Sequence, residues 1–168
     1  VTGNSNTAMG SSALRDNTGQ QNTAFGFTAL ASNTSGGSNT AVGFACLDAN
    51  TTGELNTAMG LSALSGNTTG GSNVALGRFA LATNTTASNN TAVGTNALQE
   101  NTTGTRNVAV GANVLDAATT ADDNTALGFE ALTTCTTGSD NTAIGKDALF
   151  HNTTGGFNTA VGRDALTS

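Results

Sequence analysis

Apolar and polar residues follow one pattern that recurs every 17 residues along the chain. Ten copies of Asn-Thr/Val-Ala-apolar-Gly begin at asparagines between Asn6 and Asn158. Each copy continues, in most cases, with Ala-Leu and then Asn-Thr-Thr-Gly. The first copy alone is one residue shorter, and we number the positions of each copy from its first asparagine. A period this short and strict predicts a solenoid, because one copy cannot bury its own apolar side chains and must stack on its neighbours.

Positions 2 to 5 of each copy alternate in side-chain character, which predicts a short strand. Position 4 is never polar, from Met9 and Phe25 to Val161, so we expect it to face inward, with position 2 sharing its face and partly buried. Position 3 is Ala and position 5 is Gly in every copy. That opposite face must be approached closely, by backbone across a thin coil, by a bend that needs a positive φ, or by a neighbouring chain.

A second apolar point follows at positions 8 and 9, where Leu at position 9 never varies. We expect a second strand, or an extended segment serving as one, to begin there. The Asn-Thr-Thr-Gly stretch suits a turn with left-handed backbone angles. The predicted fold is therefore all-β, a parallel β-solenoid of about ten 17-residue coils with two short strands per coil. A helical pair is disfavoured, because most copies carry two or more glycines along with several Thr and Asn residues.

Stacking at about 4.8 Å per coil gives a rod roughly 45 to 50 Å long, with equivalent residues aligned in rows. The asparagines at position 1 become a structural ladder of side-chain amides. Its members include Asn22, Asn39, Asn56, Asn73, Asn90, Asn107, Asn124 and Asn141. Each coil buries little apolar surface against the entropy of ordering 17 residues, so association of several chains is expected.

An apolar row at position 6 is the candidate interface with a neighbouring chain, and a ligand-binding stripe is the alternative. It consists of Phe27, Phe44, Leu61 and Phe129.

Composition narrows the class of protein. Aromatic residues make up 4% of the chain, Trp, Tyr and Pro are absent and there are 22 glycines, so a thick globular core is excluded. The strict register of apolar positions argues against disorder. With a net charge of −6 and five scattered basic residues, the chain is not suited to nucleic acid, and no apolar stretch is long enough for membrane insertion. The chain opens on Val1 and closes partway through a copy, so we interpret residues 1–168 as one repeat domain from a longer fibre.

Catalytic chemistry has little basis in this sequence. His151 is the only histidine, so neither a triad nor a two-histidine metal site can form within one chain. Cys46 and Cys135 are five coils apart, about 24 Å, and are expected to be buried and unpaired. The sequence therefore predicts no catalytic residue, no cofactor and no metal ion.

A short acidic stripe ends the array at position 7. Glu130, Asp147 and Asp164 face the basic residues Lys146 and Arg163 at position 6, which favours solvated charge pairs over a calcium site. Six Asn-Thr-Thr/Ser sequons arise from the turn sequence and matter only if the host glycosylates the protein.

An ice-binding β-solenoid is the alternative function. Position 13 is Thr in every copy that reaches it, and position 14 is Thr or Ser, so hydroxyls line up in rows. The candidate ice-binding row includes Thr34, Thr51, Thr68, Thr85 and Thr102. Adjacent residues of an extended chain point in opposite directions, which counts against two threonine rows on one face.

The Asn-Thr-Ala-Val-Gly string with a downstream Leu, at Asn39 to Leu47 and Asn90 to Leu98, resembles the head repeats of YadA-like trimeric autotransporter adhesins. It is even more similar to the repeat arrays of tail-fibre-domain proteins of phages and bacteria. This resemblance, which covers nearly the whole chain, implies a left-handed parallel β-roll assembled from three chains and exposed at a surface. The 17-residue unit is longer than the usual adhesin coil.

From the repeat and the resemblance together, we expect a non-catalytic structural or adhesive shaft segment of a fibre at a cell or virion surface. Its expected partners are further copies of itself, in a homotrimer, and a receptor or glycan on a host surface. A homopolymeric extracellular filament is a further alternative.

Overall fold

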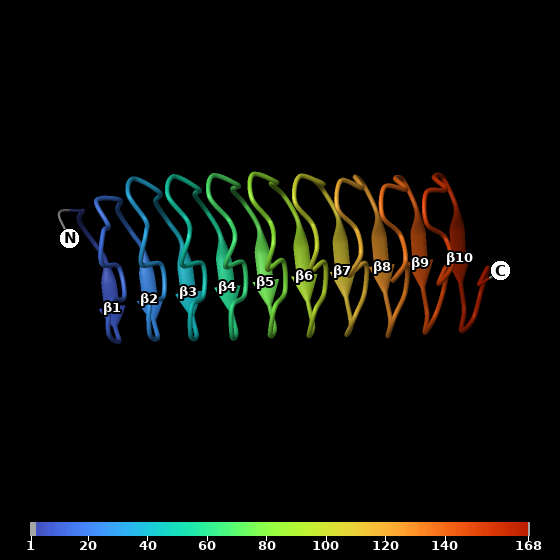
Figure 1. Ribbon diagram of the computed structural model, residues 1–168, viewed down its shortest axis with the longest axis horizontal. Helices are drawn as coiled ribbons and strands as arrows, with labels where there is room; N and C mark the ends of the chain where they lie inside the picture. The colour runs from blue at the N-terminus through green and yellow to red at the C-terminus, as the bar shows by residue number, and fades with distance from the viewer. Residues whose placement is uncertain (1–2, 168) are drawn as a thin grey trace.

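The structure is a computed structural model that describes residues 3–167. These residues form ten stacked coils and contain no helix (Figure 1). We number the coils from coil 1, which begins at Asn6, to coil 10, which begins at Asn158. Each coil contributes one strand of three residues. The strands are β1 (Thr7–Met9), β2 (Thr23–Phe25), β3 (Thr40–Val42), β4 (Thr57–Met59), β5 (Val74–Leu76), β6 (Thr91–Val93), β7 (Val108–Val110), β8 (Thr125–Leu127), β9 (Thr142–Ile144) and β10 (Thr159–Val161).

The strands make one parallel sheet in chain order, with equivalent positions paired throughout. Ala24 pairs with Ala41, for example, and Ala41 with Ala58. This register confirms the predicted parallel β-solenoid with its 17-residue coils.

The second strand expected at positions 8 and 9 is not formed. Positions 7 and 9 have left-handed backbone angles in all ten coils, with φ between 50° and 54° at the leucines of position 9. This segment is nevertheless hydrogen-bonded to its neighbours: the Leu47 N–H donates to the Ala63 carbonyl of the next coil (3.0 Å), and the Ala45 N–H donates to the Phe27 carbonyl of the preceding coil (2.9 Å). Residues with positive φ at positions 7 and 9 alternate with residues of negative φ, and this alternation bends the chain around the core. The backbone N–H and C=O groups stay hydrogen-bonded to neighbouring coils.

The prediction of left-handed residues in the Asn-Thr-Thr-Gly turn was also wrong. Positions 12 and 15 have no positive φ, and the left-handed residues lie at positions 5, 7, 9 and 17. The asparagines at position 12 point into the core instead, where they are fully buried in most coils.

Position 3, not position 4, faces the core. The interior is filled by Ala at position 3, Ala at position 8 and Leu at position 9, as with Ala58, Ala63 and Leu64, which are all 0% exposed. Position 4 points outward, and Met59 is 51% exposed. The prediction was wrong because the coil is thin: with one Leu filling its centre, only an alanine fits on the inner side of the strand.

The glycine at position 5 ends each strand with a φ between 129° and 139°, which other residues rarely adopt. A Cβ on Gly77 would lie 2.4 Å from the carbonyl oxygen of Gly94 in the next coil. Both the bend and the close approach of backbone that were considered for this face are therefore present. The backbone in question belongs to the next coil rather than to the far side of the same coil.

Two ladders of buried asparagine amides run along the interior. At position 1, each side-chain oxygen accepts a hydrogen bond from the backbone N–H of the next asparagine, at 2.8–3.0 Å. At position 12, the side-chain N–H of Asn67 donates to Asn50 Oδ1 (2.8 Å), and that of Asn84 donates to Asn67 Oδ1 (2.8 Å).

The carbonyl at position 15 connects the two ladders within a coil. The Gly70 carbonyl accepts from the side chains of both Asn56 and Asn67, each at 2.9 Å. The predicted ladder at position 1 is thus confirmed, and its amides are satisfied inside the rod.

Candidate functional site

The outer side of the ten-stranded sheet is an uncharged, largely apolar surface. It presents position 2, which is Thr or Val, and position 4, which is always apolar, and we call these two rows the sheet face. Met9 and Val161 at its two ends are each 67% exposed, and Leu127 is 46% exposed. All eleven acidic and five basic residues of the chain lie at other positions. The other position 4 side chains are exposed or partly buried, and an apolar strip that reaches solvent along the whole sheet is unusual for a protein surface that contacts only water.

The apolar row at position 6 borders the sheet face, directly after the glycine bend. Phe27 and Phe44 stack with ring centroids 5.3 Å apart and planes 15° from parallel. Phe27, Phe44, Leu61 and Phe129 are all between 41% and 54% exposed. The row is interrupted by Arg78, Thr95 and Ala112 between Leu61 and Phe129. The candidate interface residues therefore reach the surface and extend the sheet face along part of the rod.

Threonines at positions 13 and 14 form a second regular surface, which we call the threonine face. The position 13 hydroxyl donates to the position 13 carbonyl of the next coil, as from Thr51 to Thr68 (2.9 Å) and from Thr68 to Thr85 (3.0 Å). Thr34 and Thr102 of the same row make equivalent bonds. These bonds fix the rotamer in successive coils. The candidate ice-binding hydroxyls therefore already donate their hydrogen bonds to backbone carbonyls of the rod. They can only accept hydrogen bonds from water.

Position 14 is exposed in every coil that has it, from Ser35 to Thr154. Position 13 is itself exposed or only partly buried, so residues of both threonine rows reach solvent. The opposite orientation expected for an extended chain does not bury either row, because the backbone bends at these positions.

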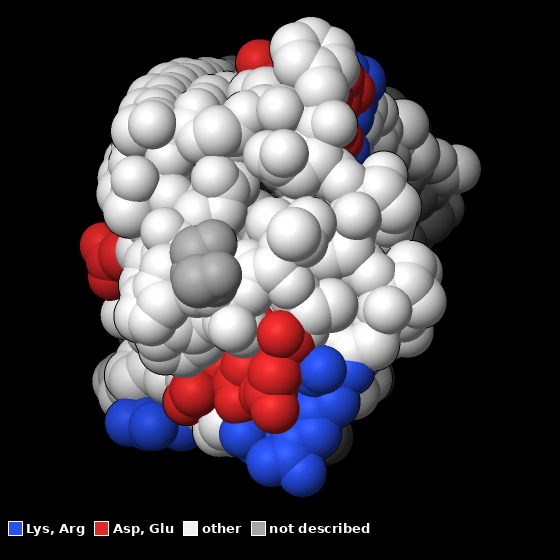
Figure 2. Space-filling model, turned by 90° about the vertical axis from the view of Figure 1, so that its right-hand side faces the viewer, with Lys and Arg blue, Asp and Glu red and all other residues white. Residues whose placement is uncertain are grey.

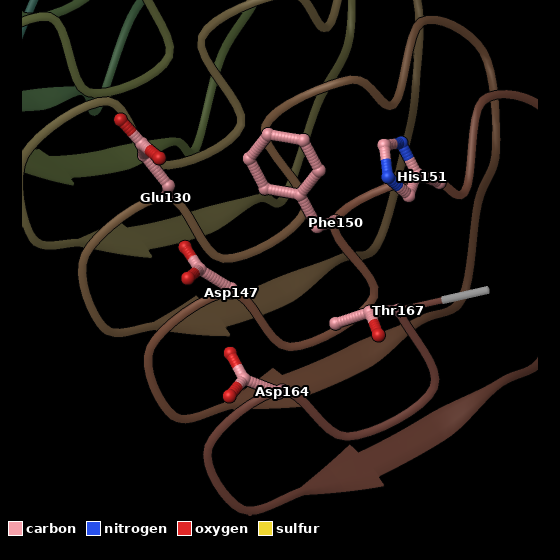
Figure 3. A pocket seen from close by; sticks show the side chains of 6 residues that line it. All are labelled: Glu130, Asp147, Phe150, His151, Asp164 and Thr167. Carbon is pink, nitrogen blue, oxygen red and sulfur yellow. The ribbon is translucent and has the colours of Figure 1, made fainter.

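The acidic row at position 7 lies beside a surface hollow of about 340 Å³ near the C-terminal end of the rod. Glu130, Asp147 and Asp164 follow one another on successive coils, and Phe150 faces them across the hollow (Figure 3). Lys146 pairs with Asp147, and Arg163 Nε lies 3.2 Å from Asp164 Oδ2, so the predicted charge pairs are confirmed. Seen along the rod, acidic and basic atoms lie side by side in a group at the bottom of the view, and smaller groups of charged atoms lie elsewhere on the rim (Figure 2).

The two cysteines are free and fully buried, as expected. Burial raises the pKa of Cys46 to about 12, and burial also raises the pKa of Cys135, so neither thiol is reactive in the closed rod. His151 is exposed and its ring meets Phe150 edge-on, with centroids 4.8 Å apart. Within residues 3–167, no group of three or more His, Cys, Asp and Glu side chains is arranged to hold a metal ion.

The sequons lie in the second amide ladder, which sequence analysis missed. Five of the six sequon asparagines are fully buried with their amides hydrogen-bonded, namely Asn33, Asn50, Asn67, Asn84 and Asn101. An oligosaccharide cannot be attached to these side chains in the folded rod. The sequence did indicate a row of asparagines, since position 12 is Asn in most coils. A turn and a buried ladder both favour asparagine, however, so the recurrence alone did not distinguish them.

Comparisons with family models, with curated proteins and with solved structures gave no match to this chain. The part of the chain that the structure describes has no helix of the length and apolar character needed to cross a membrane.

Proposed function

We propose that this chain is a non-catalytic shaft segment of a fibre at a cell or virion surface, in which several copies pack side by side and hold binding parts away from that surface. Uniform coils support this role, because a rod of this kind lengthens by adding identical units without changing its cross-section. The observation that carries the proposal is the sheet face, which is largely apolar, regular and free of charge along all ten strands.

A second copy of the chain is the occupant that best fits the sheet face. The molecule carries a net charge of −6, so two copies repel each other least when they meet through faces that carry no charge. With ten strands and its position 6 border, the face measures about 43 by 13 Å, roughly 550 Å². That is of the same order as the roughly 800 Å² that each partner buries in a stable complex. Parallel packing of three chains about a common axis would align equivalent coils and cover the three faces together.

The oligomeric state in solution tests this proposal. We expect light scattering coupled to size exclusion to give the mass of three chains. Val93→Lys, in the middle of the sheet face, should shift the protein to monomer, because three buried ammonium groups would meet near one axis. Thr69→Lys on the threonine face is the matched control and should leave the trimer intact. A stable monomer at tens of micromolar wild-type protein would overturn the proposal, and a mass far above three chains would instead favour the homopolymeric filament.

Ice binding is the second candidate, and the observation that favours it is the threonine face. Hydroxyls and methyl groups recur there at about 4.8 Å along the rod, with rotamers held by the bonds between coils. A rigid, regular and neutral array can match a crystal lattice with little loss of side-chain entropy on binding.

Thermal hysteresis at millimolar protein tests ice binding with the same two variants in exchanged roles. Thr69→Lys should abolish hysteresis, because one long charged side chain disrupts the array, and Val93→Lys should preserve it. Absence of hysteresis in the wild-type protein would exclude this function.

A further inference from the structure

The amide ladder at position 12 is continuous through the first six coils and then stops. It runs from Asn17 to Asn101, with each side chain donating to the one before it. Coil 7 has Ala118 at this position and coil 8 has Cys135, while coil 9 returns to Asn152. Three successive junctions, from coil 6 to coil 9, therefore lack the buried amide bond that joins the earlier coils.

Asn101 marks the break with an unpaired oxygen. Its side chain is fully buried, and its Oδ1 has no hydrogen-bond partner among the described residues. In the earlier coils, this oxygen accepts from position 12 of the next coil, as Asn67 Oδ1 does from Asn84. The methyl group of Ala118 cannot donate. A buried acceptor left without a partner weakens the closed state relative to an opened one in which water reaches it.

The rod adapts around the break in two ways. In coils 7 to 9, the position 1 side chains donate to the preceding position 1 oxygen, as from Asn124 to Asn107 Oδ1 (3.1 Å), besides their usual bond to the position 15 carbonyl. On the outside, the guanidinium of Arg106 in coil 6 donates two hydrogen bonds of 2.7 Å to the carboxylate of Asp123 in coil 7. This ion pair is exposed, so water and salt weaken it.

We propose that the rod opens locally at this interruption, so that the three junctions between coil 6 and coil 9 part and expose coils 7 and 8, while the first six coils stay stacked. Coils of a solenoid contact only their neighbours, so stability is a sum of junctions and the weakest junctions open first. A shaft with this feature yields at a fixed place instead of unravelling from one end. The inference concerns the junctions themselves and does not depend on the fibre role.

The two cysteines provide a matched pair of probes for this opening. Cys46 lies in coil 3 and Cys135 in coil 8, so each is in the third coil from one end of the ten-coil rod and both are fully buried. Fraying of the terminal coils 1 and 10 alone exposes neither, because a complete coil still covers each cysteine. We expect a thiol reagent to label Cys135 about tenfold faster than Cys46 in the wild-type protein. The labelled peptides are resolved by mass spectrometry, and each rate is normalised to that of the denatured chain.

Restoring the ladder identifies the cause. Ala118→Asn should slow labelling of Cys135 by about fivefold and leave Cys46 unchanged, because its amide can donate to Asn101 Oδ1. Ala112→Asn, at position 6 of the same coil, is the control and should change neither rate. High salt should accelerate Cys135 alone by weakening the Arg106–Asp123 pair.

Equal labelling of the two wild-type cysteines would overturn the proposal without any variant. Unchanged Cys135 labelling in a folded Ala118→Asn protein would overturn the role of the ladder. If that variant does not fold, amide exchange of the wild-type protein gives the decision: faster exchange at Leu115 and Thr119 than at Leu64 and Thr68 supports local opening, and equal exchange contradicts it.

Discussion

Single asparagine side chains hold the coils in register, because each buried amide bonds both along the rod and across its own coil. Asn67 donates to Asn50 Oδ1 and to the Gly70 carbonyl, and it accepts from Asn84. A shift of one residue between neighbouring coils would leave all of these groups unpaired in the core. Polar groups therefore specify the stacking that small apolar side chains such as alanine cannot specify alone.

Replacing one of these amides tests its contribution. Asn67→Ala removes the partners of Asn50 Oδ1 and of one Asn84 N–H, and we expect the free energy of unfolding in urea to fall by about 2–4 kcal/mol. The fold itself should persist, since coil 7 already carries Ala118 at this position. Thr69→Ala, which alters an exposed side chain two residues away, should change stability by less than about 0.5 kcal/mol. Equal effects of the two substitutions would contradict a ladder role.

Cys46 gives the rod a defined response to alkaline pH. Its pKa is raised by burial to about 12 from an ordinary 9.0, so the folded thiol stays protonated while the unfolded thiol ionises. Stability from this group is complete below about pH 9 and declines as pH rises toward the folded pKa of about 12.

At about pH 10, this difference costs about 1.4 kcal/mol of unfolding free energy. Cys46→Ala introduces the alanine that most coils have at position 8 and removes this alkaline loss of stability. Cys135 is present in both the wild-type protein and the variant, so its contribution cancels in the comparison. Urea unfolding of the two proteins at neutral pH and at pH 10 measures the difference. The same pH dependence in both would show that Cys46 is not the group responsible.

At the scale of the strand, periodicity predicted the element and its register but not which side faces inward. Alternation distinguishes two faces, and size then suggested that the larger residues, such as Met59 and Leu76, form the core. In a coil this thin the opposite holds, because Leu64 already fills the centre and only alanine fits opposite it. The left-handed leucines could not be predicted either. Their φ values are unfavourable for an isolated residue and are maintained by hydrogen bonds to neighbouring coils.

Coil 1 shows which part of the coil tolerates a change of length. It lacks position 14, so Asn17 bonds to a carbonyl two residues ahead instead of three, yet Thr7 still pairs with Thr23. Deletion of Thr69 from coil 4 should therefore preserve the sheet and lower stability only modestly.

Deletion of Ala75 from β5 is the contrasting case. Leu76 would take the inward position, where only an alanine fits, and Gly77 would lose its place at the bend. We expect the far-UV circular dichroism spectrum to be retained after deletion of Thr69 and lost after deletion of Ala75. Retention of the spectrum by both proteins would mean that the strand can slip without penalty.

At the scale of the whole molecule, stability depends on contacts between adjacent coils, because each coil touches only the one before and the one after it. Removing one complete coil should then leave two coils that still match at every position. Excision of residues 56–72 joins Leu55 to Asn73 and lets Asn39 Oδ1 accept from the Asn73 N–H. We expect the shortened chain to keep the same circular dichroism per residue and a cooperative urea transition, with a slightly lower midpoint.

Excision of residues 56–64 is the control: it leaves half a coil, places core leucines against surface positions and should abolish the transition. If both shortened chains unfold alike, the coils are not interchangeable units, and the rod depends on contacts beyond adjacent neighbours.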